Sequence, residues 1–139
     1  MTAPSPGRWG PRWSRSSTSR SARTGLRDAE ARDADFDPLT VETVVDDHKA
    51  YYPGATRLRV RVTGDRRDGR LLGAQILGST QAQVAKRVDV YAAAIAARLS
   101  VDEVTDLDLS YTPPFSAPWD PVQAAAQAWQ RVREPLLAR

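Results

Sequence analysis

The sequence predicts an α+β domain in which an antiparallel sheet of three to four strands packs against helices. Residues 57–63 (RLRVRVT) alternate strictly between apolar and polar, mostly basic, side chains, as in a strand with one solvated face. Residues 79–99 instead repeat apolar side chains every three or four positions, as in a helix with one buried face. Strands precede helices rather than alternating with them, so a doubly wound nucleotide-binding sheet is not expected.

The predicted elements follow one another from residue 24. Residues 24–35 (TGLRDAEARDAD) are rich in alanine, arginine and acids, and they predict a short helix with Thr24 as its N-cap. Residues 39–45 (LTVETVV) are rich in β-branched side chains and predict a strand. The strand over 57–63 turns at GDRRDG and returns over 70–78, where two glycines allow close approach of other groups. These three strands are expected to form an antiparallel sheet.

The helical part of the chain carries its own start signals. After the long helix, Ser100 and Glu103 have the spacing of a capping box, which predicts a short second helix. Residues 106–110 (DLDLS) predict a last strand. Asp120 and Pro121 suit the N-cap and the first position of a final helix.

The N-terminal segment differs from the rest in composition. Residues 1–25 hold five of the 20 basic residues and no acid, so the net charge of +3 conceals a remainder with 15 basic and 17 acidic residues. Residues 1–23 lack periodicity, and we expect a disordered basic arm there, followed by one domain over 24–139. A transit peptide is an alternative, since such peptides are also rich in Arg and Ser. A nucleic-acid partner is not expected, because it would depend on this arm alone.

Several classes of chemistry have no basis in this sequence. Cysteine is absent, which removes disulfides and thiolate chemistry carried by the chain itself. The single histidine, His48, cannot build a two-histidine site, so no metal is expected. The eight glycines form neither GxGxxG nor a P-loop, and no apolar run reaches the ~18 residues of a membrane span. We therefore expect a cytoplasmic protein that is not an enzyme by itself and has no membrane partner.

Residues 109–121 (LSYTPPFSAPWDP) place Tyr111, Phe115 and Trp119 among four prolines. Proline fixes the backbone, so such a loop presents its side chains with little entropy left to lose. The rings either seal the core of the domain or form rigid contacts with a partner, and the residues alone favour the core. Trp129 lies at helical spacing in the final helix, which is more typical of a core or interface residue than of a ligand platform.

Four motifs occur in order between residues 24 and 129: HKAYYPGA, GRLLGAQILG, KRVDV and YTPPFS. With this order and spacing, the chain resembles the C-terminal dimerisation domain of FAD-dependent pyridine nucleotide-disulfide oxidoreductases. The resembling branch contains coenzyme A-disulfide reductases, NADH oxidases and NADH peroxidases. The resemblance implies an antiparallel sheet with helices packed against it. It also implies a two-fold dimer in which this domain of one subunit covers the active site of the other.

The resemblance further implies roles for individual residues. Tyr111 and Tyr51 would reach across the interface to the flavin and the sulfur chemistry, with Tyr51 preferred over Tyr52. His48 and Tyr52 would contact substrate, although His48 also fits a solvated loop histidine. The implied interface residues are Lys86, Arg87, Tyr91, Pro113, Pro114, Phe115 and Trp119. Lys86 and Arg87 fit solvated helix charges equally well.

The chain departs from the family because it lacks the FAD- and NAD-binding domains and the reactive cysteine. We therefore expect FAD and NAD(P)H only in full-length enzymes, not on this chain alone. The preferred interpretation is a non-catalytic dimerisation module that forms a homodimer. One alternative is a separate subunit that completes the active site of a flavin- and NAD-binding partner. A second alternative is a basic-armed protein associated with nucleic acid.

The residues before Thr24 also depart from the family. Family members carry a buried strand there, whereas this chain reads WGPRWSRSSTSRSAR. Our hypothesis is an interrupted reading frame, under which the module is the end of a longer reductase. Loss of that strand is expected to expose a sheet edge and destabilise the domain.

Overall fold

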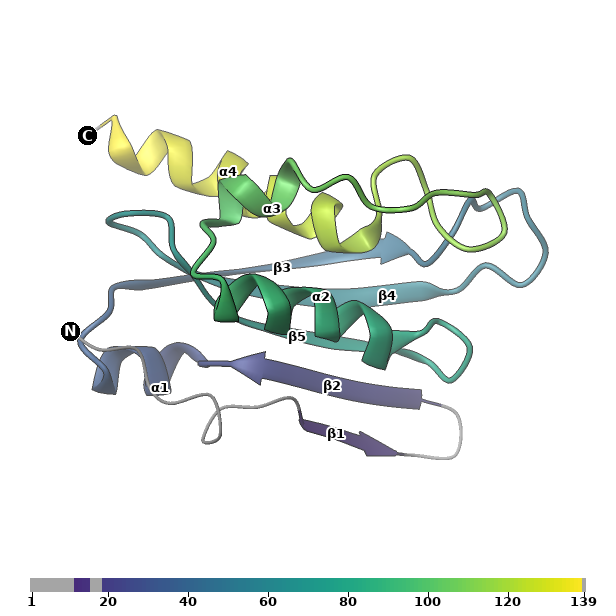
Figure 1. The fold of residues 1–139 in the computed structure, drawn as a ribbon, viewed down its shortest axis with the longest axis horizontal. Helices are drawn as coiled ribbons and strands as arrows, with labels where there is room; N and C mark the ends of the chain where they lie inside the picture. The colour runs from purple at the N-terminus through teal and green to yellow at the C-terminus, as the bar shows by residue number, and fades with distance from the viewer. Residues whose placement is uncertain (1–11, 16–18, 139) are drawn as a thin grey trace.

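The computed structural model describes residues 12–15 and 19–138, with side chains from residue 19 onward. The elements, in chain order, are β1 (Arg12–Arg15), β2 (Ser19–Gly25), α1 (Asp28–Asp33), β3 (Pro38–Asp46), β4 (Arg57–Asp65), β5 (Leu71–Ser79), α2 (Val84–Ala96), α3 (Val101–Thr105) and α4 (Pro121–Leu137). Figure 1 shows one sheet crossed by α2, with α3 and α4 on its β3 side.

The described strands form one antiparallel sheet in the order β1-β2-β5-β4-β3. Its register pairs Val60 of β4 with Ile76 of β5 and with Thr43 of β3. Leu58, Val60 and Val62 are fully buried, whereas the arginines between them are exposed. The alternation in β4 therefore marks the two faces of the sheet as predicted, and the α+β class is confirmed.

The core lies between one face of the sheet and the helices. Helix α2 packs on β5 and β2, α4 packs on β3 and β4, and α3 packs against α4. Trp129 of α4 is fully buried, and its Nε1 donates to the carbonyl oxygen of Leu39 at 2.7 Å. Gly64 of β4 lies against the Trp129 indole, where any Cβ would collide with the ring. Trp129 is thus a core residue, as one of its two predicted roles required.

The structure corrects the expected disordered arm at residues 12–15, which form β1, and at residues 19–23, which belong to β2. This strand pairs with β5 over its whole length, and β1 pairs with its other edge. The side chains of Ala22 and Thr24 are small and buried on the face that α2 covers, so a strand of polar composition still packs. A strand therefore lies before Thr24, and the edge of β5 is covered. The expectation for residues 1–11 and 16–18 lies outside the described residues.

The first predicted helix is shorter than expected and begins at Asp28. Its N-cap is Arg27 instead of Thr24, because Thr24 belongs to β2. The Glu30 carboxylate accepts from the Arg27 backbone amide at 2.8 Å and forms an ion pair with Arg23 of β2 at 3.1 Å. Helix α1 is thereby tied to the edge region of the sheet that the sequence did not predict.

The other helix starts follow their signals with one exception. Helix α2 begins at Val84 instead of residue 79, because Ser79 is the last residue of β5. The capping box is confirmed: the Glu103 amide donates to Ser100 Oγ at 3.1 Å, and the Ser100 amide donates to Glu103 Oε2 at 2.7 Å. Asp120 caps the first turn of α4, as predicted.

The strand predicted over residues 106–110 is wrong, because these residues form a loop after α3. The side-chain amide of Gln123, on α4, donates to the carbonyl oxygens of Thr105 at 3.1 Å and Leu107 at 2.6 Å. Leu107 and Leu109 still pack against the core. A helix side chain, not a neighbouring strand, therefore satisfies the backbone at the start of this segment.

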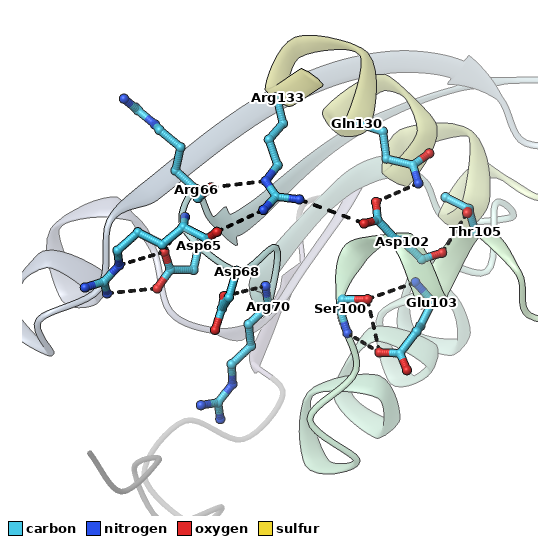
Figure 2. Close-up of polar contacts among 11 residues, drawn as sticks. Asp65, Arg66, Asp68, Arg70, Ser100, Asp102, Glu103, Thr105, Gln130 and Arg133 are labelled. Carbon is cyan, nitrogen blue, oxygen red and sulfur yellow. Dashed lines mark hydrogen bonds and ion pairs between the residues drawn. The ribbon is translucent and has the colours of Figure 1, made fainter. Parts of the chain in front are cut away.

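A polar network ties the β4–β5 turn to α3 and α4 (Figure 2). Arg133 of α4 donates to the carbonyl oxygens of Arg66 and Arg67, both at 3.1 Å, and lies 3.9 Å from Asp102 of α3. Gln130 donates to Asp102 at 2.7 Å. Figure 1 places this turn at the end of the sheet opposite to the β3–β4 loop. One end of the domain is thus closed by polar contacts within the chain.

Candidate functional site

Two loops carry five exposed aromatic side chains. Loop 1 (residues 47–56) joins β3 to β4, and loop 2 (residues 106–120) joins α3 to α4. Both reach the same end of the sheet in Figure 1. The interpretation that the rings of loop 2 seal the core is therefore wrong. The exposed fractions are 72% for Tyr51, 37% for Tyr52, 40% for Tyr111, 68% for Phe115 and 57% for Trp119.

Loop 1 is closed at its base by a buried carboxylate. Asp47 accepts from the Thr56 backbone amide at 2.8 Å and from the Thr56 hydroxyl at 3.2 Å. Nearer the tip, the Tyr52 amide donates to the Lys49 carbonyl oxygen at 2.9 Å. The rings of Tyr51 and Tyr52 lie with their centroids 5.5 Å apart and their planes tilted by 49°. The sequence folds this way because the side chain of an Asp that follows a strand can satisfy the backbone across the loop.

His48 lies beside this closure. Its Nδ1 is 3.0 Å from Asp47 Oδ1, and only 11% of its side chain is exposed. The interpretation of His48 as a solvated loop residue is therefore wrong. The Nδ1 side of the ring therefore faces the carboxylate that closes loop 1. Contact of His48 or Tyr52 with a substrate stays a prediction.

Loop 2 is shaped by a turn and a cap. The amides of Phe115 and Ser116 donate to the Thr112 carbonyl oxygen at 3.0 and 3.1 Å. The Ser116 hydroxyl donates to Asp120 Oδ2 at 2.7 Å, while Asp120 Oδ1 caps α4. Two prolines inside the turn fix their own φ angles. The Phe115 side chain is therefore exposed on a backbone that is already hydrogen-bonded.

The structure separates the three predicted interface residues of α2. Lys86 is exposed, as an interface residue must be in the free domain. Tyr91 is fully buried, and its hydroxyl donates to the Val122 carbonyl oxygen at 2.8 Å. Burial raises the pKa of Tyr91. Arg87 is only 7% exposed. The predictions that Arg87 and Tyr91 contact a partner are therefore wrong, because both residues are buried within the domain. The alternative prediction for Arg87, a solvated helix charge, is wrong as well.

The remaining predicted residues lie on loop 2. Pro113 is partly buried and Pro114 is exposed. Sequence reasoning missed Asp47 and Ser116, which hold the loops, because short polar residues are ordinary in loops. The position of Arg87 could have been found from spacing. It follows Val84 by three residues and precedes Tyr91 by four, and therefore shares the buried stripe of α2.

The exposed aromatic side chains of these loops supply hydrogen bonding and apolar contact. The phenol hydroxyls of Tyr51 and Tyr111 can donate or accept, and Phe115 and Trp119 offer apolar surface. Over the described ranges, 12–15 and 19–138, no three His, Cys, Asp or Glu side chains meet in a way that could hold a metal ion. Within the same ranges, no helix is long and apolar enough to cross a membrane.

Comparison with known proteins identifies relatives for most of the chain. The family model for the pyridine nucleotide-disulphide oxidoreductase dimerisation domain matches residues 17–121. A coenzyme A disulfide reductase of Staphylococcus haemolyticus is 40% identical over 85 residues, which are 61% of this chain and 19% of that protein. An NAD(P)H sulfur oxidoreductase (CoA-dependent) of Pyrococcus furiosus is 34% identical over 105 residues, which are 76% of this chain and 23% of that protein.

Solved structures agree with the sequence matches. An NAD-dependent persulfide reductase from A. fulgidus superimposes with a TM-score of 0.86 and 32% identity, over 92% of this chain and 24% of that one. A water-forming NADH oxidase from Lactobacillus brevis gives a TM-score of 0.84 over 91% of this chain and 28% of that one, and its 17% identity supports the fold alone. This chain thus spans about a fifth to a quarter of the length of the relatives at 30% identity or above.

Proposed function

We propose, from the premise that this chain belongs to the pyridine nucleotide-disulphide oxidoreductase dimerisation-domain family, that loops 1 and 2 form the centre of a contact with a second subunit. The observation that carries the proposal is the exposure of five aromatic rings on two loops at one end of the sheet. Aromatic side chains are enriched at the centres of protein interfaces. The assembly we propose is a homodimer in the cytoplasm.

The internal contacts of both loops favour this role. Asp47 closes loop 1, and the Thr112 carbonyl oxygen accepts two amides of loop 2. A surface that is ordered before its partner arrives loses less conformational entropy on binding. Lys86, on the adjacent α2, adds a cation at the rim, where charges are more common than at the centre of an interface.

FAD and NAD(P)H are the cofactors of the family's full-length enzymes, and the residues of this chain do not fit them alone. Dinucleotide sites use a glycine-rich turn between a strand and a helix, and the eight glycines here form no such pattern. The exposed phenols of Tyr51 and Tyr111 each offer one hydroxyl group, which can donate or accept a hydrogen bond. We propose that these two hydroxyls contribute to the active site of a partner that holds the flavin.

Self-association tests the proposed interface. In static light scattering at tens of micromolar, the wild-type chain is expected to be a dimer and Phe115→Ser a monomer, because the substitution removes an exposed apolar anchor. Leu137→Ser is the matched control, since Leu137 is 57% exposed but lies at the far end of α4. This control is expected to remain a dimer. A monomeric wild-type chain would contradict the proposal.

A second candidate function is that of a separate subunit that completes a flavin- and NAD-binding partner. It is favoured by the 40% exposure of Tyr111, which leaves this residue open to contact with another chain. Tyr111→Phe keeps the ring and removes the hydroxyl, so it should lower the reductase activity of a reconstituted mixture about tenfold or more if that group donates a proton. Self-association of the variant should be unchanged. Absence of reductase activity in every mixture with the wild-type chain would count against this candidate.

A further inference from the structure

We infer that Arg87 is a positioning residue that fixes loops 1 and 2 relative to each other. The inference rests on the proposed function only in that loops 1 and 2 are taken to bind a partner. The contacts of Arg87 themselves are made within the chain. No predicted role of Arg87 included this one. Its guanidinium is the group through which three separate segments of the chain meet.

The contacts of the guanidinium are with backbone carbonyl oxygens. One terminal nitrogen, Nη2, donates to the carbonyl oxygen of Asp47 in loop 1 at 2.6 Å and to that of Phe115 in loop 2 at 3.2 Å. The other, Nη1, donates to the carbonyl oxygen of Ala82 in the turn before α2. Asp47 and Phe115 are 68 positions apart in the sequence and are linked here through one nitrogen atom. Both loops are therefore attached to the start of α2.

The charge of Arg87 has a further partner in loop 2. Its Nε lies 3.7 Å from Asp120 Oδ1, an ion pair that is longer than a hydrogen bond. Asp120 in turn accepts from Ser116 and caps α4 at Val122. The charge of Arg87 thus reaches the turn that presents Phe115. Removal of one partner from such a network leaves the other charge without compensation.

The location of Arg87 shows that these contacts offset a real cost. The residue is 7% exposed and lies in the first turn of α2. Burial of a cation is unfavourable unless it is hydrogen-bonded, and the helix dipole disfavours a cation at this end. The carbonyl oxygens of three segments and the Asp120 carboxylate supply the compensation. Lysine cannot replace this planar fork of donors, because its ammonium is a single point charge.

Hydrogen–deuterium exchange of the intact chain tests the inference. The reporters are amides near Arg87 that it does not itself bind, namely those of Thr56, Phe115 and Ser116. In Arg87→Met and Arg87→Lys these amides should exchange about tenfold faster or more, because local opening becomes easier. Amides of β4 and α3 should keep their wild-type rates. Arg131→Met, which removes an exposed arginine of α4, is the control and should leave all reporters unchanged.

Chemical rescue separates positioning from simple core packing. Arg87→Ala should loosen both loops, and added methylguanidinium should restore slow exchange at Thr56 and Phe115. Equal acceleration in β4, α3 and the loops would show that Arg87 merely stabilises the whole domain, and this result overturns the inference. Unchanged reporter rates in folded Arg87→Met overturn it as well.

A second variant covers the case in which the Arg87 variants fail to fold. Asp120→Asn keeps an N-cap oxygen for α4 and removes the charge opposite Arg87 together with the oxygen that accepts from Ser116, so Ser116→Ala, which removes that hydrogen bond alone, is its control. Exchange at Phe115 and Ser116 should accelerate, while amides of α4 beyond its first turn stay protected. Wild-type rates at both reporters in this variant would overturn the inference.

Failure of the inference and failure of the proposed function give different results. If the wild-type chain is a monomer but its loop amides exchange faster in Arg87→Met, the proposed function is contradicted and the positioning role is supported. A wild-type dimer whose loop amides exchange as fast as those of Arg87→Met overturns the positioning role and leaves the proposed function standing.

Discussion

Gln123 illustrates how a single buried side chain can direct the path of the backbone. It lies on the inner side of α4 and is 4% exposed. Its amide donates to two carbonyl oxygens, those of Thr105 and Leu107, where α3 ends and loop 2 begins. A helix end normally leaves its last carbonyl groups without partners. Gln123 therefore fixes the exit of α3 and the start of the loop that carries Tyr111.

Gln123→Met tests this role. The substitution keeps a side chain of similar length but leaves two carbonyl oxygens without their donor, which should lower the free energy of unfolding by about 1–3 kcal/mol. Urea denaturation followed by tryptophan fluorescence measures the change. Gln127→Met, a partly buried position on the same helix, is the control and should change stability by less than about 0.5 kcal/mol. Equal stability of Gln123→Met and wild type would contradict the assigned role.

Side-chain roles were harder to predict than the burial of single residues. The burial of Val60 and Trp129 follows from period, because a side chain that repeats with its neighbours shares their face. The buried position of Arg87 followed from the same rule, but its charge suggested solvent. Its actual partners are backbone carbonyls of segments distant in sequence, and no local pattern encodes such contacts. The same holds for Gln123.

Helix α1 is held in place by a carboxylate with an unusual pKa. Burial alone would raise the pKa of Glu30, but the hydrogen bonds from Arg27 and the contact with Arg23 outweigh it. The pKa falls from the ordinary 4.5 to about 2. A group whose pKa is depressed in the folded state stabilises that state above its unfolded pKa. Its contribution is therefore complete above pH 4.5 and is lost as the pH falls through about 2.

Glu30→Gln should reduce the sensitivity of the domain to acid. The free energy of unfolding of wild type should decrease between pH 4.5 and about 2 more steeply than that of the variant. Arg23→Met removes one partner of the carboxylate and should reduce the slope in the same direction. Urea titrations at several pH values measure both. Parallel pH profiles for wild type and Glu30→Gln would show that the carboxylate does not have the depressed pKa.

At the level of elements, regular periodicity decided which predictions succeeded. β4 and α2 have clear periods of two and of three to four, and both were predicted. β2 was missed because its buried positions carry only Ala22, Thr24 and Gly25, which give almost no hydrophobic signal. Residues 106–110 alternate like a strand but have α4 as their neighbour. Whether an alternating segment joins a sheet depends on tertiary neighbours, which sequence reasoning did not supply.

The two ends of the domain differ in how their polar and apolar groups are satisfied. At one end, the network around Arg133 forms hydrogen bonds with the backbone of the β4–β5 turn, as Figure 2 shows. At the other end, loops 1 and 2 leave their aromatic side chains exposed. The end with the Arg133 network should therefore affect stability, and the end with loops 1 and 2 should affect association.

Arg133→Met and Phe115→Ser should separate these two properties. Arg133 donates to two carbonyl oxygens and stacks 5.5 Å from the Trp129 ring centre, so its loss should cost about 1–3 kcal/mol of stability. Phe115→Ser should change stability by less than about 0.5 kcal/mol, because the ring is exposed. Urea denaturation and light scattering on both variants give the comparison, with the exposed Arg131→Met as control. A folded Arg133→Met that no longer associates would contradict this division of the molecule.

β2 has a consequence for how this domain can change over evolutionary time. Its place in the sheet depends on backbone pairing with β5 and on two small inward side chains. A segment with so few requirements for particular residues can accept many substitutions, whereas the valines of β4 cannot. Substitutions can therefore accumulate in this strand while the fold is inherited unchanged. Related chains should be most divergent at this strand and most alike at the centre of the sheet.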